Sequence, residues 1–145
     1  MNAAYVHLVL NHFPPVVGVG ALIVLAFGAL WRNDGVLRAA FVLILFGGLM
    51  GVGTFVSGRG AERVVKDLEG VNAAAIEPHQ EAAGLTLVTY ILAALAALFA
   101  LTRRTVPRWA ATLVIVLTFF ATASSVYTAL LGGRIHHPET KIRAR

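Results

Sequence analysis

Residues 82–102, AAGLTLVTYILAALAALFALT, run for the length of a membrane crossing without a charged side chain. A helix needs roughly 20 apolar residues to cross a hydrocarbon core of about 30 Å. Three further windows, 13–31, 39–58 and 109–133, also contain no charged side chain. A spanning β-strand would need only about 10 residues and would alternate in polarity, which these windows do not. The sequence therefore predicts four transmembrane helices.

The composition excludes several classes of function. Of the 145 residues, 58% are hydrophobic and only 13% are charged, a balance typical of membrane proteins. The absence of cysteine excludes disulfides, zinc–thiolate sites, iron–sulfur clusters and covalent haem attachment. The net charge is +5, but the basic residues flank the apolar windows, which indicates lipid headgroup contacts and topology rather than nucleic-acid binding. The first window lacks a basic leader and is too long for a signal peptide.

The predicted fold is all-α: one integral membrane domain, 1–145, that forms an up-down-up-down four-helix bundle. The predicted segments are helices at about 4–31, 36–57, 78–102 and 108–131, with a polar tail at 132–145. Because short polar turns join the first and second pairs of helices, these neighbours should be antiparallel. Gly132 and Gly133 are expected to end the last helix. Four crossings place both termini and the long connection, 57–78, on one side.

All five histidines map to that same side of the predicted bundle. His7 and His12 open the first helix, His79 opens the third, and His136 and His137 follow the fourth. A single histidine at a membrane interface usually needs no function. Five on one side predict a shared site, because ionisable groups in membrane segments tend to mark functional positions.

Imidazoles without thiolates suit haem iron, copper or zinc. The sequence predicts haem b held between His12 and His79, with His7 and His137 as the next candidate ligands. If the site instead held copper or zinc, the same four histidines would be the metal ligands; no catalytic residue is predicted. Arg59 and Arg134 lie on the same side, where they would pair with haem propionates or with lipid headgroups.

Two prolines follow His12 directly. Since Pro14 and Pro15 lack backbone donors, they should leave carbonyls near Leu10 and Asn11 free and bend the first helix. Such a bend would turn His12 inward. In the alternative, Pro14 begins the span and residues 3–12 lie along the interface. The glycines at 47 and 51, spaced as GxxxG, favour close helix packing over room for a porphyrin.

The segment HLVLNHFPPVVGVGAL, residues 7–22, resembles the His-Phe-Pro opening of small four-helix membrane proteins in domain-of-unknown-function family 2231. The similarity continues through GTFVSGRGAE at 53–62, IEPHQEAAGL at 76–85 and LGGRIHHPE at 131–139. The chain departs from the pattern in the spacing of its first two histidines and in Leu8. The resemblance implies four transmembrane helices and favours His137 over His136, while the family's activity is largely unassigned.

The predicted function is a small b-type cytochrome-like protein or subunit that exchanges electrons with quinol or a protein partner. The alternatives are a cofactor-free structural or assembly subunit of a larger membrane complex, and a non-haem metal-binding membrane protein. The expected partners are the lipid bilayer, a quinone, and other membrane subunits or further copies of the chain, but no nucleic acid. The expected location is the bacterial inner membrane, with the histidines periplasmic because the N-terminus carries no basic residue.

Overall fold

The structure, a computed structural model, describes residues 2–136 and is helical, with no strand in that part of the chain. Its elements in chain order are α1 (Ala3–Leu10), α2 (Phe13–Leu30), α3 (Asp34–Val65), the short 3₁₀ helix η1 (Ala73–Ala75), α4 (Ile76–Leu101) and α5 (Arg108–His136). Four stretches are long and apolar enough to cross a membrane: Ala3–Leu30, Asp34–Val65, Ala73–Leu101 and Arg108–His136. The predicted all-α class is confirmed, and the chain has the features of an integral membrane protein.

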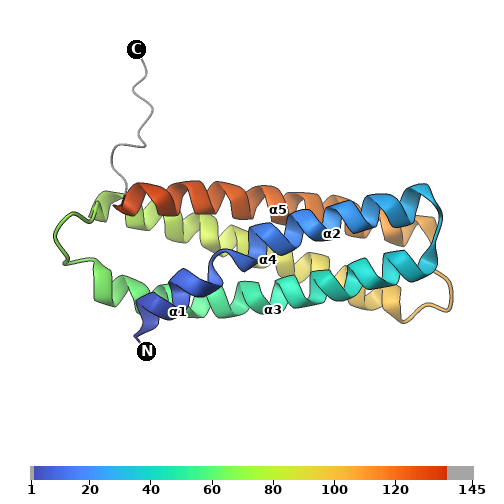
Figure 1. The fold of residues 1–145 in the computed structure, drawn as a ribbon, viewed down its shortest axis with the longest axis horizontal. Coiled ribbons are helices and arrows are strands. Elements are labelled where there is room, and N and C mark those ends of the chain that lie inside the picture. Colours follow the sequence, from blue (N-terminus) through green and yellow to red (C-terminus); the bar gives the residue numbers. More distant parts are fainter. Residues whose placement is uncertain (1, 137–145) are drawn as a thin grey trace, which may run out of the picture.

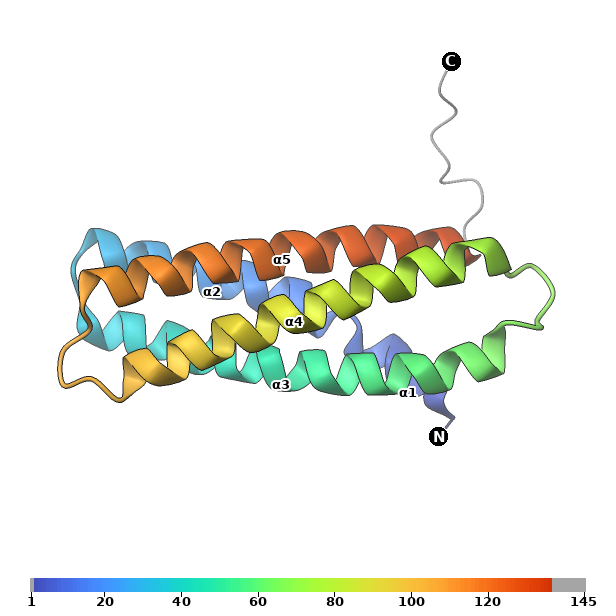
Figure 2. The ribbon, with the colours of Figure 1, turned by 180° about the vertical axis from the view of Figure 1, so that it is seen from behind.

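The helices lie side by side in an elongated bundle (Figures 1 and 2). α1 packs on α3, whereas α2 packs on both α3 and α5, and α4 packs on α3 and α5. The connections at 31–33 and 102–107 lie at one end of the bundle, which we call the turn end. At the other end, which we call the histidine end, α1, the start of α4 and the last turns of α5 meet near the 66–72 connection (Figure 1).

Small residues fill the interior of the bundle and large apolar residues cover its outside. Ala21, Ala93 and Ala97 are fully buried, while Val16 and Leu30 are mostly exposed. This pattern reverses that of a water-soluble protein and is typical of helices that pack closely within lipid. An outer surface of exposed leucine, valine and phenylalanine side chains is what a bilayer would cover.

Aromatic residues mark both ends of the apolar surface. Trp31 and Trp109 are exposed at the turn end, and Tyr5 and Tyr127 are exposed toward the histidine end. Amphipathic aromatic rings prefer the two membrane–water interfaces, so their positions agree with a bundle that spans a bilayer along its long axis.

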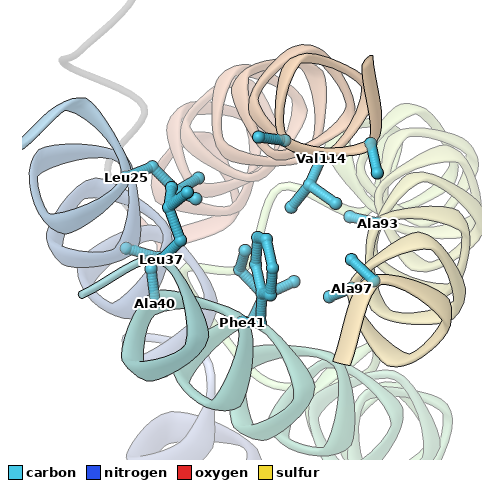
Figure 3. Close-up of a cluster of buried hydrophobic side chains, with 12 residues drawn as sticks. Leu25, Leu37, Ala40, Phe41, Ala93, Ala97 and Val114 are labelled. Carbon is cyan, nitrogen blue, oxygen red and sulfur yellow. The ribbon is translucent and has the colours of Figure 1, made fainter. Parts of the chain in front are cut away.

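The turn end contains a dry apolar core. Leu25, Leu37, Phe41 and Val114 meet there among buried alanines (Figure 3). Polar groups close this end from outside: Arg38 of α3 donates to the carbonyls of Leu101, Arg103 and Arg104, which satisfies acceptors after the end of α4. One turn further along α5 from Val114, the buried hydroxyl of Thr118 has no hydrogen-bond partner in the structure.

Glycines make room for Tyr90 in the middle of the bundle. Tyr90 of α4 is 1% exposed, and a Cβ added to Gly47 would lie 3.2 Å from its ring. A Cβ on Gly18 would collide with the Tyr90 hydroxyl. The GxxxG spacing of α3 therefore serves packing inside the chain, as the sequence led us to expect, with Tyr90 as the residue that fills the space.

Two helices extend beyond their predicted ends. α3 continues to Val65, past the expected end near residue 57, where α1 packs along its final turns. α5 continues through Gly132 and Gly133 to His136, although these glycines were expected to end it. The carbonyl of Ile135 accepts a hydrogen bond from the backbone N–H of Asn72 at 2.9 Å, which ties the extended end of α5 to the 66–72 connection.

Candidate functional site

At the histidine end the structure brings together the side chains of His7 from α1 and His79 from α4. Their ring centroids are 6.4 Å apart and the ring planes are inclined by 80°. The two rings come from residues far apart in the sequence, and both side chains are partly buried. They form the pair around which the site is described.

His7 is held by α3. Its Nδ1 lies 3.0 Å from the carbonyl oxygen of Thr54 and 3.4 Å from the hydroxyl of Ser57. The imidazole also occupies the space beside Gly58, where an added Cβ would lie 3.0 Å from Cε1 of His7. α3 thus supplies the carbonyl of Thr54 as an acceptor. Four residues later, Gly58 leaves a notch, a space without a side chain, that the imidazole fills.

His79 is held by α5 in the same way. Its Nδ1 lies 3.0 Å from the carbonyl oxygen of Thr128, and an added Cβ on Gly132 would lie 3.0 Å from its Cε1. Gly132 therefore lies inside a continuous helix because the imidazole needs its place. This contact gives Gly132 a packing role within α5, whereas Gly133, which α5 also includes, has open space at its Cβ position.

The two arrangements, which we call half-sites, are equivalent. Each consists of a histidine, a threonine carbonyl 47 or 49 residues later in the chain, and a glycine one helical turn beyond it. The signal in the sequence is a repeated Thr-x-x-x-Gly, at 54–58 and at 128–132. We predicted no role for Thr54, Gly58 and Thr128 and a helix end at Gly132, because the pattern is short and its meaning depends on the histidine that lies beside it.

The hydrogen bonds select one tautomer of each neutral imidazole. A carbonyl oxygen only accepts, so Nδ1 of His7 and Nδ1 of His79 must each carry the proton. The proton-free Nε2 then keeps its lone pair. Metal-ligating histidines are commonly oriented in this way, with the second ring nitrogen bonded to a backbone carbonyl.

His12 does not belong to either half-site. It is exposed, and its Nδ1 bonds the carbonyl of Leu8 in the preceding turn at 3.1 Å. A side-chain donor that satisfies one of the last carbonyls of a helix acts as a cap, so His12 closes α1 at its break from α2. The sequence favoured His12 and His79 as the pair, whereas the ring contact in the structure joins His79 to His7.

The break between α1 and α2 bears out the predicted effect of the prolines. The carbonyl of Leu10, which Pro14 cannot bond, lies 3.1 Å from Oγ1 of Thr54, and the single proton of this hydroxyl is shared with the carbonyl of Met50 at 2.8 Å. The carbonyl of Pro14 accepts from the hydroxyl of Tyr90. Both bonds come from other helices, so the irregular backbone is satisfied within the protein rather than by lipid. Asn11 Oδ1, at the break, is buried and has no hydrogen-bond partner in the structure.

Arg59 and Arg134, which the sequence placed with the histidines, are both exposed at the histidine end. Arg134 lines a cavity of about 220 Å³ with Pro78, the neighbour of His79, and Arg59 is exposed next to Gly58. His136 is exposed at the end of α5, and His137 lies outside the described residues. Both arginines are therefore at the correct end of the bundle.

Carboxylates do not complete a metal site among residues 2–136. No group of three or more histidine, aspartate, glutamate or cysteine side chains is close enough there to hold an ion. Glu62 instead accepts from the amide of Gln80 at 2.6 Å, which links α3 to α4. Glu77 and Glu81 are exposed.

Hydroxyl groups line the interior on the histidine side of Tyr90. Thr86 and Thr128 are 2.9 Å apart, and Thr89 and Ser124 are 3.1 Å apart, both between α4 and α5. Such bonds join helices where water is absent. The interior is thus polar toward the histidine end and apolar at the turn end.

Comparisons with protein-family models, with curated proteins and with solved structures gave no match.

Proposed function

We propose that the protein is a small b-type cytochrome-like membrane protein in which one haem is held between His7 and His79. The observation that carries the proposal is the ring contact at 6.4 Å between two imidazoles, each oriented through Nδ1 by a backbone carbonyl. The bundle would cross the membrane up-down-up-down, with the histidine end at one surface.

The number of donors favours haem over zinc. A zinc site takes three or four protein ligands, and residues 2–136 offer no such group. A haem iron takes four of its bonds from the porphyrin and needs only two axial ligands from the protein. Two imidazoles on different helices are that complete set.

The separation of the rings fits two ligands of one ion. Metal–nitrogen bonds of about 2.1 Å place the ring centroids of two imidazole ligands about 5 to 6.5 Å apart, depending on the angle at the metal. The centroids of His7 and His79 are 6.4 Å apart, at the long end of that range. His7 and His79 would therefore be able to hold one ion between them.

The protein would bind the haem and orient its two histidine ligands, and the use of both ligands would limit the haem to electron transfer. A bound haem supplies one-electron chemistry, and with His7 and His79 both used as ligands no position stays open for a gas or a substrate. Arg59 and Arg134 lie near the half-sites, where they would pair with the propionates. Such a site transfers electrons.

The electron partner would meet the protein at the histidine end. The opposite end contains the apolar core, whereas the two imidazoles lie at the histidine end and interhelical hydroxyl pairs lie between them and Tyr90. We propose quinol in the bilayer or a second protein as that partner. We also propose the bacterial inner membrane, with the histidine end periplasmic because the N-terminus lacks basic residues.

The resemblance to family 2231 bears on the same residues. Three of the segments that carry it, 53–62, 76–85 and 131–139, include Thr54, Gly58, His79 and Gly132. Thr128 lies outside these segments and the chain departs from the family pattern around His7, so the resemblance adds to the proposal only at His79, Thr54 and the two glycines.

Haem reconstitution tests the proposal. Purified protein titrated with haemin should give a low-spin spectrum that sharpens on reduction and does not change with carbon monoxide. His7→Ala and His79→Ala should each abolish that spectrum, and His12→Ala should retain it. Absence of haem uptake, or a spectrum that survives loss of His7 and His79, would refute the proposal. Uptake of copper or zinc by the same pair, measured by elemental analysis, would favour the non-haem metal alternative.

The cofactor-free alternative has one observation in its favour. Each imidazole already fills a notch and bonds a carbonyl, so His7 and His79 also act as links between helices. In that case His7→Ala and His79→Ala would lower thermal stability without any spectroscopic change. The titration with haemin therefore separates the two functions.

A further inference from the structure

We infer that Gly58 and Gly132 are positioning residues that set the span between the two imidazoles. The inference rests on the proposed function for its ligand, but its geometry concerns the protein alone. Each glycine lies against the ring of one histidine, on the helix that also provides the carbonyl acceptor. Together they would decide where the two Nε2 atoms lie.

The contacts of the two glycines match atom by atom. A Cβ on Gly58 would lie 3.0, 3.2 and 3.8 Å from Cε1, Nδ1 and Nε2 of His7. A Cβ on Gly132 would lie 3.0, 3.3 and 3.8 Å from the same atoms of His79. Contacts of 3.0–3.4 Å are tighter than nine in ten real Cβ contacts, so an added methyl group would displace each ring by a few tenths of an ångström.

The direction of that displacement gives the glycines their effect. The close approach is to the Cε1–Nδ1 edge, which also carries the hydrogen bond to the threonine carbonyl. A methyl group would therefore strain the hydrogen bond from Nδ1 to the threonine carbonyl. The same displacement of the ring would tilt the Nε2 lone pair. Groups that orient metal ligands through the second ring nitrogen typically contribute 10–100-fold to affinity.

The chain provides matched controls. A Cβ added to Gly133, the neighbour of Gly132 on the same helix, would meet nothing within 4 Å, and the same holds for Gly20 in α2. Gly133→Ala and Gly20→Ala change helix propensity by the same amount as the test substitutions, without touching a histidine.

Nitrogen-15 NMR of histidine-labelled full-length protein in nanodiscs is the first measurement, made without haem. We expect His7 and His79 to show a protonated Nδ1 and a proton-free Nε2. Gly58→Ala should move only the resonances of His7, and Gly132→Ala only those of His79. The two controls should move neither. Protonated Nε2 atoms, or resonances that ignore the glycine substitutions, would overturn the inference.

Titration with haemin is the second measurement. Gly58→Ala and Gly132→Ala should weaken binding about 10- to 100-fold, while the controls bind as the parent protein does. Altered resonances without haem binding in any variant would retain the positioning role and refute the proposed haem. Unchanged haem affinity in both test variants would refute the positioning role alone.

A variant that does not fold still gives an answer. If Gly132→Ala unfolds, the double variant Gly132→Ala/His79→Ala removes the ring that the methyl group displaces. Recovery of folding would confirm the contact with His79. Persistent unfolding would assign Gly132 to helix packing and would overturn the inference.

Discussion

His7 and His12 belong to the same short segment of sequence, yet their side chains do different things. His7 points its Nδ1 at a carbonyl of another helix, whereas His12 bonds a carbonyl of its own turn. The first bond crosses between α1 and α3, and the second closes α1. Only the neighbouring helix distinguishes a ligand candidate from a cap, because residue type and depth are similar for both.

Tyr90 is the residue on which we expect the stability of the bundle to depend most. Its hydroxyl bonds the carbonyl of Pro14, and its ring fills space left by glycines. Tyr90→Phe should lower the free energy of unfolding by about 0.6–1.7 kcal/mol, the range for interhelical hydrogen bonds in membranes. Tyr90→Ala should cost about 3–5 kcal/mol because it also leaves a cavity.

Equilibrium unfolding in mixed micelles measures both values. Tyr127→Phe is the control, since Tyr127 is 58% exposed on the outside of α5. An equal effect of Tyr90→Phe and Tyr127→Phe would contradict the role of the buried hydroxyl.

At the scale of the element, α1 and α2 form one candidate membrane span whose helix is interrupted between Leu10 and Phe13. Side chains of other helices compensate for the backbone hydrogen bonds lost there. Pro14 leaves the carbonyl of Leu10 free, and Thr54 of α3 bonds it. The same threonine offers its own carbonyl to His7. One residue of α3 thus stabilises the break and orients the histidine, which couples the two features.

Thr54→Val tests this coupling. The substitution removes the hydroxyl shared by the carbonyls of Leu10 and Met50 but keeps the carbonyl of Thr54, so stability should fall by about 1 kcal/mol. Adding Pro14→Ala should recover part of the loss, because the new N–H at position 14 can bond Leu10. Thermal denaturation of the two single variants and the double variant gives the coupling energy.

Thr102→Val is the control for the lost hydroxyl, since Thr102 bonds only the carbonyl of Phe99 in its own turn. Strictly additive effects of Thr54→Val and Pro14→Ala would show that Thr54 does not compensate for the proline.

At the scale of the whole molecule, the bundle differs from end to end. Leu25, Phe41 and Val114 seal the turn end (Figure 3), while hydroxyl groups and two imidazoles lie toward the histidine end. A bilayer around this molecule would leave the pair near one surface. Under the proposed function, electrons would then be exchanged from a single side of the membrane.

Cysteine accessibility measures this arrangement directly, because the chain contains no cysteine of its own. Glu69→Cys in the 66–72 connection and Arg104→Cys in the 102–107 connection should lie on opposite sides of the membrane. A membrane-impermeant maleimide should label one of them in sealed right-side-out vesicles and both after solubilisation. We expect Glu69→Cys to react first.

The labelling pattern also decides orientation. Reaction of Arg104→Cys alone would keep the predicted crossing and reverse the orientation. Equal labelling of both in sealed vesicles would refute the single crossing that α4 is predicted to make between the two connections.

The sequence by itself determined the membrane class and the four helices, because both follow from long apolar windows that need no knowledge of neighbours. It also predicted the free carbonyl at Leu10, since a proline lacks its donor in any fold. These features depend only on residues close together in the sequence, so they can be predicted without knowledge of the fold.

Only the tertiary structure decided which histidine meets His79 and why α5 continues through Gly132. Both depend on which atoms lie across an interface, and the glycine at 132 would end a helix in isolation but accommodates an imidazole in the bundle. The two half-sites likewise join residues 47 and 49 positions apart. A contact between helices is a property of their packing, so the sequence could gather the histidines at one end but could not pair them.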